Sequence, residues 1–182
     1  MEKWTREVQL KDDTKILLRL EIKSDFPMLW EMYSTLTMKS LQFLPEPPTE
    51  ERVRGWVENI NYDRVMPILG RVRTKDGQEK IIASATLAFS NQQSTKHVAD
   101  FGIVVHDDYQ NKGLGIILTK YMLEIAMERG ISRVTLKVVT ENERAIHVYK
   151  KIGFKVEGNL VNNHYNSHTG QYGDDYIMAI LL

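Results

Sequence analysis

ADFGIVVHDDYQNKGLG, residues 99–115, is the most informative stretch of the sequence, because it leads from an expected strand through a glycine-containing loop into an expected helix. The apolar run at 99–105 predicts the strand, and apolar spacing at 114–129 predicts the helix. The first backbone N–H groups of a helix lack partners within the helix and carry partial positive charge. Glycines beside them let a large anion approach. The loop 110–115, with Lys112 in it, therefore indicates a phosphate or pyrophosphate site.

Two common nucleotide-binding motifs do not fit this loop. A P-loop requires Gly-Lys followed by Ser or Thr, whereas here Lys112 precedes Gly113. A dinucleotide fingerprint requires Gly or Ala three residues after Gly115, where Leu118 stands. A loop in which the glycines only turn the chain remains the alternative at this point.

The apolar patterning and turn signals along the rest of the chain predict one α/β (α+β) domain over residues 1–182. Strands are expected at 15–22, 65–72, 81–89, 99–105, 134–139 and 176–182, with a further one near 154–157. Helices are expected near 25–36, 49–60, 114–129 and 140–152. The order is β-α-α-β-β-β-α-β-α-β, or β-α-α-β-β-β-α-β-α-β-β with the extra strand, which gives a mixed sheet with helices on both faces.

Two blocks of the sequence resemble a known family. The strand 99–105 followed by Gln110, Gly113 and Gly115 resembles the Gln/Arg-x-x-Gly-x-Gly/Ala motif of the GCN5-related N-acetyltransferases (GNAT). The second block is similar to that family's Asn-x-x-Ala-x-x-x-Tyr-x-x-x-Gly-Phe pattern and comprises Asn142, Ala145, Tyr149, Gly153 and Phe154. The resemblance is good over 81–182, whereas the N-terminal part agrees only in its β-α-α order. It implies a mostly antiparallel GNAT-like central sheet.

The resemblance also implies a site for acetyl-CoA as cosubstrate, with no metal. Backbone groups of Ile103, Val104 and Val105 are expected to pair with the pantetheine arm as an added strand would. The amides expected to hold the pyrophosphate belong to Gln110, Asn111, Lys112, Gly113, Leu114, Gly115 and Ile116. Asn142 is expected near the pantetheine and Tyr149 near the thioester sulfur, while Lys112 and Lys151 are expected to pair with phosphates.

Acetyl transfer to an amine requires a proton acceptor and a proton donor. An alkylammonium with a pKa of about 10.4 must lose a proton, and a thiolate leaving group with a pKa of about 8.5 benefits from gaining one. Tyr149 is the expected donor, with a simple core aromatic as the alternative. Asp100 is the first candidate for the base, because the family often carries Glu at this strand position, and a solvated carboxylate is the alternative. Glu141 is the second candidate, although a carboxylate there also suits a helix start.

The composition limits the other functions. Hydrophobic residues make up 42%, charged residues 26%, and the formal net charge is zero, so neither nucleic acid nor a membrane is an expected partner. The sequence has no cysteine, which excludes an acetyl-cysteine intermediate and favours direct transfer in a ternary complex. The charged residues 1–7 do not resemble a secretory signal, and we expect a cytoplasmic enzyme. A homodimer is an open expectation, since dimers are frequent in the family.

The acceptor is the least constrained part of the prediction. A protein or peptide amine, at a lysine or an N-terminus, is the first hypothesis; a polyamine, amino acid or antibiotic amine is the second; and a non-catalytic acyl-CoA sensor is the third. His164 and His168 have metal-compatible spacing, but 162–170 has the composition of a loop or turn and no metal is expected. Asp174, Asp175 and Glu46 could attract a cation, although loop carboxylates are usually solvated.

Overall fold

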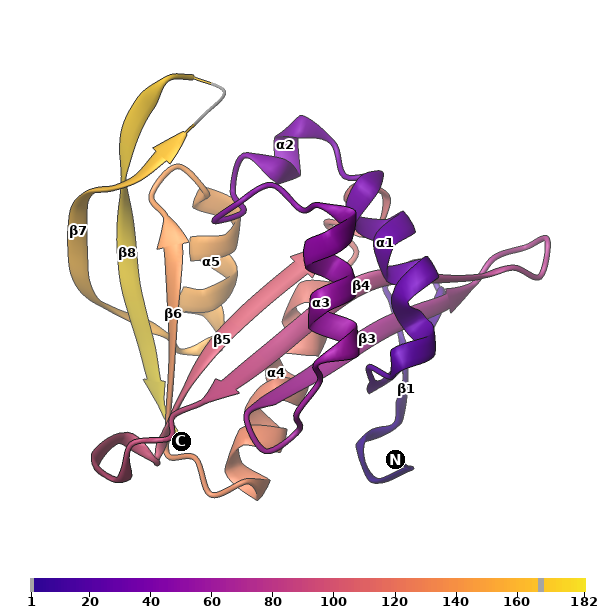
Figure 1. Ribbon diagram of the computed structural model, residues 1–182, viewed down its shortest axis with the longest axis horizontal. Helices are drawn as coiled ribbons and strands as arrows, with labels where there is room; N and C mark the ends of the chain where they lie inside the picture. The colour runs from indigo at the N-terminus through magenta and orange to yellow at the C-terminus, as the bar shows by residue number, and fades with distance from the viewer. Residues whose placement is uncertain (1, 167–168) are drawn as a thin grey trace.

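A mixed eight-stranded sheet forms the centre of the computed structural model, which describes residues 2–166 and 169–182 (Figure 1). The strands are β1 (Arg6–Gln9), β2 (Lys15–Leu20), β3 (Val65–Arg73), β4 (Glu79–Phe89), β5 (Val98–Val105), β6 (Arg133–Val139), β7 (Lys155–Asn166) and β8 (Gln171–Leu181). Their order is β1-β2-β3-β4-β5-β6-β8-β7, and within these ranges only β5 and β6 pair in parallel. The predicted mixed, mostly antiparallel sheet is confirmed.

Helices cover both faces of the sheet, as predicted. They are α1 (Phe26–Ser34), α2 (Met38–Leu41), α3 (Glu50–Glu58), α4 (Leu114–Glu128) and α5 (Glu143–Ile152). Figure 1 shows α1 and α3 in front of the sheet and α4 behind it. Side chains of successive strand residues point to opposite faces. Ile81 therefore packs in a cluster with residues of α1 and α3, whereas Ile82 joins the larger core that contains Leu118 of α4.

Local sequence signals account for the ends of the helices. Thr49 caps α3, because its hydroxyl accepts a hydrogen bond from the Arg52 N–H at 3.2 Å. Gly153 ends α5 with a φ of 120°, and its N–H donates to the carbonyl of Tyr149 at 3.1 Å. A non-glycine residue would be strained at this φ.

The sheet opens between β5 and β6. The two strands are paired only at Val98↔Arg133, Ala99↔Val134 and Asp100↔Thr135. Beyond Asp100, β5 stays paired with β4 as far as Val105↔Ala83, while β6 stays paired with β8. The C-terminal half of β5 therefore has a strand on one side and a gap on the other.

Three features differ from the sequence prediction. β1 and α2 were not predicted, since Arg6–Gln9 is a short and mostly polar edge strand and α2 is a single turn. Residues 162–166 were expected in a loop but belong to β7, which pairs with β8 on both sides of an irregularity between Leu160 and His164. No helix in the described residues is long and apolar enough to cross a membrane.

Candidate active site

Two adjoining cavities lie at the gap between β5 and β6. The larger has a volume of about 980 Å³ and is lined by β4, β5, β6, β8, the end of β7 and residues 42–48. The smaller has a volume of about 230 Å³ and is lined by the glycine loop, the start of α4 and one side of α5. Both are lined by Ile103, Val105, Gln110, Arg144 and Tyr149, so they meet at these residues. The gap therefore connects the two faces of the sheet.

The glycine loop forms the wall of the smaller cavity. Asn111 and Gly113 have φ values of 62° and 92°, and this left-handed backbone turns the chain into α4. Gly113 is the N-cap of α4, and Gly115 and Ile116 in its first turn line the cavity. A Cβ added at Gly115 would meet no protein atom within 4 Å. The unpartnered N–H groups of this helix start thus face open space large enough for an anion.

The cations at this cavity differ from those expected. Lys112 Nζ is held 3.1 Å from a carboxylate oxygen of Asp12, and neither Lys112 nor the exposed Lys151 lines the smaller cavity. Lys11 and Arg144 line it instead. Arg144 could have been suspected because it lies two residues after Asn142 in the second motif. Lys11 could not, since it comes from the β1–β2 turn, which sequence reasoning did not connect with the loop.

The exposed edge of β5 offers backbone groups to the gap. The His106 N–H donates to the Ile82 carbonyl of β4 at 2.9 Å. Because backbone groups alternate along a strand, the N–H of Val104 also points toward β4, whereas those of Ile103 and Val105 point into the gap. Of the three residues expected to pair with an extended ligand, Ile103 and Val105 therefore have the suitable orientation.

Gln110 anchors the loop through its side chain. Its Nε2 donates to the Val105 carbonyl and to the Ser40 hydroxyl, both at 2.9 Å, and its Oε1 accepts from Arg144. Asp107 adds a second connection to α2, because its carboxylate accepts from the Thr37 N–H at 2.9 Å and from the Ser40 hydroxyl at 2.7 Å. The glycine loop, α2 and α5 are thus joined around the cavities.

Tyr149 lies on α5 where the two cavities meet. Its side chain is 8% exposed and packs edge-on against Phe101, with ring centroids 6.4 Å apart, and tilted against Phe154 at 5.7 Å. Burial raises the pKa of the Tyr149 hydroxyl to about 12, so it stays protonated at neutral pH. Tyr149 therefore packs in the core, as the alternative interpretation expected, and also lines both cavities.

The two predicted carboxylates lie apart from the cavity surface. Asp100 is exposed, accepts a hydrogen bond from the Thr135 hydroxyl, and is not among the residues that line either cavity. Glu141 is exposed in the turn before α5, where the Thr140 hydroxyl donates to it at 3.1 Å. The assignment of either as a base stays a prediction. Asn142 caps α5 by accepting from the Ala145 N–H at 3.2 Å and lines the larger cavity.

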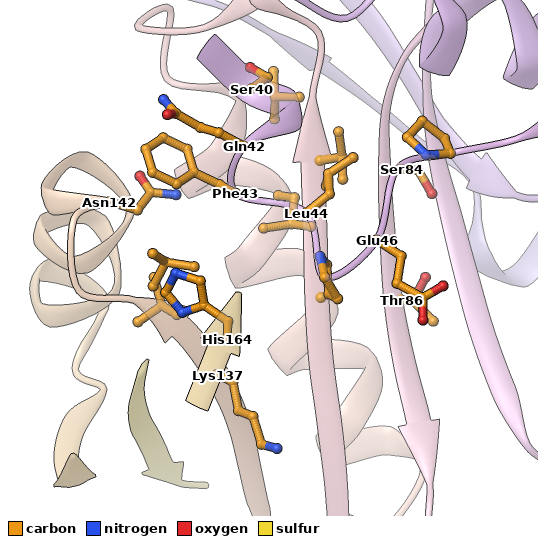
Figure 2. A pocket seen from close by; sticks show the side chains of 18 of the residues that line it. Ser40, Gln42, Phe43, Leu44, Glu46, Ser84, Thr86, Lys137, Asn142 and His164 are labelled. Carbon is orange, nitrogen blue, oxygen red and sulfur yellow. The ribbon is translucent and has the colours of Figure 1, made fainter. Parts of the chain in front are cut away.

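The larger cavity contains a histidine and carboxylate pair that the sequence prediction missed. His164 Nδ1 lies 3.0 Å from Asp175 Oδ1, and Asn163 Nδ2 donates to Asp175 Oδ2 at 2.6 Å. Asp175 is 6% exposed, so it is not the solvated loop carboxylate that was expected. Figure 2 shows His164 near Asn142 at one side of the pocket, with Ser84 and Thr86 at the other. His168 lies outside the described residues, within which no group of three potential metal ligands occurs.

The sheet that splits between β5 and β6, with a glycine loop at a helix start beside the gap, is the fold of an acyltransferase. The sequence profile of the Acetyltransferase (GNAT) family matches residues 28–154, and the chain belongs to this family. The predicted resemblance is thereby confirmed.

Named relatives include two curated bacterial enzymes. The chain is 35% identical over 100 residues to the L-amino acid N-acetyltransferase AaaT of Escherichia coli, covering 54% of this chain and 60% of that protein. It is 34% identical over 80 residues to the [Ribosomal protein bS18]-alanine N-acetyltransferase of Salmonella typhimurium, covering 44% and 53%. The matches thus span little more than half the length of these relatives. An acetyltransferase of the GNAT family from Streptococcus pneumoniae has a similar structure, with a TM-score of 0.74, 27% identity and coverage of 92% and 99%.

Proposed function

We propose that the protein transfers an acetyl group from acetyl-CoA directly to a primary amine. The observation that carries this proposal is the gap between β5 and β6, where the free edge of β5, the start of α4 and Tyr149 converge. These residues fit the donor. The strand edge suits the amides of a pantetheine arm, and the helix start with Lys11 and Arg144 suits a pyrophosphate. Open space at Gly115 leaves room for both.

The chain's own groups supply positioning and proton transfer. The bound donor provides an activated thioester carbonyl, whose oxygen the Val105 N–H is oriented to stabilise as negative charge develops. The amine nitrogen forms the new C–N bond, and the electron pair of the broken C–S bond stays on sulfur. Tyr149 gives its hydroxyl proton to that sulfur, which its raised pKa of about 12 permits because the group is still protonated at working pH. Asp100 and Glu141 remain proposed bases from the sequence.

The acceptor is proposed to enter on the side of the larger cavity. Its volume of about 980 Å³ lies within the range of small-molecule sites, and part of it would hold the acyl end of the donor. A lysine side chain or an N-terminus of a protein or peptide would fit the remaining space and is the first candidate. A small amine is the second, favoured by the enclosure of the cavity between residues 42–48 and the β7–β8 hairpin.

Release of free CoA thiol from acetyl-CoA, measured with matched amines, tests the proposal. Peptides with a free or blocked N-terminus and with or without lysine form one set, and amino acids, polyamines and aminoglycosides form the other. Turnover with one set assigns the acceptor class. Tight binding of acetyl-CoA with no turnover on any amine would instead support the non-catalytic sensor. A parallel series of acyl-CoA donors tests whether acetyl is the preferred group.

The cytoplasmic location and the homodimer also remain proposals, the latter testable by light scattering.

A further inference from the structure

We propose that His164, oriented by Asp175, is the general base that deprotonates the acceptor amine; this inference rests on the proposed function. His164 lines the larger cavity together with Tyr149 and Asn142. Asp100 and Glu141 do not line it. An imidazole changes protonation between pH 5 and 8, which suits proton removal near neutral pH.

The hydrogen bonds fix the ring in the form that a base requires. An ionised carboxylate only accepts, so the 3.0 Å contact with Asp175 makes Nδ1 the donor and leaves the lone pair on Nε2. Asn163 donates to the other oxygen of Asp175 at 2.6 Å and holds the carboxylate in place. A buried carboxylate that orients an imidazole through Nδ1 is the arrangement that catalytic triads use.

An irregularity in β7 brings both side chains to Asp175. The register between β7 and β8 shifts between Leu160 and His164, and Asn162 there has a φ of 52°. Asp174 stabilises this segment by accepting from the Asn162 N–H at 2.9 Å and from Asn159 Nδ2 at 3.0 Å. Bulges of this kind redirect side chains and are frequent beside active sites. As a result, the consecutive residues Asn163 and His164 both reach Asp175.

Gly173 on the paired strand leaves the space that the ring occupies. A Cβ added there would lie 2.5 Å from His164 Nε2, closer than non-bonded atoms approach. Glu141 Oε1 lies 3.2 Å from the same point, so a side chain at this position would also meet that carboxylate. The charged groups near His164 include Asp175 and Asp174 from β8 and Glu141 from the turn before α5. Four more charged residues line the same cavity: Lys137 from β6, Arg144 from α5, Arg52 from α3 and Glu46.

The proton and electron balance of the proposed reaction is complete. His164 Nε2 takes a proton from the ammonium form of the acceptor, whose nitrogen lone pair then attacks the thioester carbon. The C–S bond breaks, sulfur receives the Tyr149 proton, and the Tyr149 oxygen regains a proton from the newly bonded nitrogen. The products are the amide and the free thiol, and His164 returns its proton to solvent.

The test compares pH profiles of kcat/KM for the full-length wild type, His164→Gln, Asp175→Asn and Gly173→Ala. We expect His164→Gln to lose about 100-fold in kcat/KM at pH 7. We expect the kcat/KM of the wild type to fall toward acid pH as the base becomes protonated, and His164→Gln should lack this fall, with the Kd for acetyl-CoA unchanged. The exposed His97, which lines neither cavity, provides the control His97→Gln, which should match the wild type.

Asp175→Asn tests orientation separately from the imidazole. Asn163 would hold the amide oxygen, so the amide nitrogen would donate to Nδ1 and force the proton onto Nε2. We expect a loss comparable to that of His164→Gln, with no further loss in the double variant. Gly173→Ala should reduce activity by displacing the ring. Transfer by His164→Gln at the wild-type rate with an unchanged profile would refute the dyad alone, whereas a wild type inactive on every amine would refute the proposed function instead.

Discussion

Arg144 Nη1 donates a hydrogen bond to Gln110 Oε1, and this bond joins α5 to the glycine loop where the two cavities meet. Gln110 is a neutral amide, and no described carboxylate forms an ion pair with Arg144. Its guanidinium charge is therefore not neutralised at the donor cavity. Lys112, by contrast, has the carboxylate of Asp12 at 3.1 Å.

This difference predicts which cation matters more for the donor. Replacing Arg144 with Gln should weaken acetyl-CoA binding by about 10- to 100-fold, since a charge-assisted hydrogen bond to phosphate contributes roughly 1.5–3 kcal/mol. Lys112→Gln should have a smaller effect, because Asp12 already compensates that charge. Calorimetric Kd values for acetyl-CoA and for dephospho-CoA, at low and high salt, provide the measurement. Equal losses in the two variants would contradict the assignment.

Gly113 and Gly115 should respond differently to the same substitution. Gly113 has a φ of 92°, so Gly113→Ala should lower stability by about 1 kcal/mol or more and also weaken binding. Gly115 lies in the first turn of α4 with open space beside it, so Gly115→Ala should leave the melting temperature unchanged and weaken acetyl-CoA binding alone. Thermal unfolding and acetyl-CoA titration of both variants separate the two effects. Normal binding by Gly115→Ala would contradict the proposed pyrophosphate site.

Tyr149→Phe should lower kcat about 100-fold while KM for acetyl-CoA changes little, because only the proton donor is removed and the ring packing against Phe101 and Phe154 is kept. The pKa of about 12 means that deprotonation of this hydroxyl should cause no loss of wild-type activity below about pH 10. A steady-state pH series provides the measurement. Full activity of the variant across that range would exclude the donor role.

The sequence predicted the parts of the site that are encoded locally. The helix start at Gly113 depends on residues a few positions apart, and motif spacing finds such features. The helix expected from residue 140 is also present, but it begins later, at Glu143 after the cap Asn142. The class of the sheet follows from the apolar runs that predict its strands.

The missed features depend on contacts between distant segments. Lys11 reaches the glycine loop only because the β1–β2 turn folds next to it, with the Lys11 N–H 3.4 Å from the Lys112 carbonyl. His164 was assigned to a loop, since polar residues at 162–166 carry no strand pattern, and its pairing with Asp175 depends on the register of β7 and β8. Register across an irregular hairpin is a tertiary property that composition does not report.

Glu21 is a buried carboxylate that lines neither cavity, and it should make stability depend on pH. It is 4% exposed, and burial, with Asp25 as a further negative charge, raises its pKa to about 7 from an ordinary value of 4.5. Arg19 lies close by, but its guanidinium is bound to both carboxylate oxygens of Asp25.

Between these two pH values the folded state therefore binds more protons at Glu21 than the unfolded state does. The free energy of unfolding should then fall as pH rises from about 4.5 to about 7 and level off above, by roughly 3 kcal/mol in total. Glu21→Gln should remove this slope, so that the variant is the more stable protein at pH 8 and similar to the wild type near pH 4.5. Urea unfolding at several pH values measures the difference, with Glu58→Gln at the exposed end of α3 as a control that keeps the slope. Parallel wild-type and Glu21→Gln stability curves would show that another group carries the pH dependence.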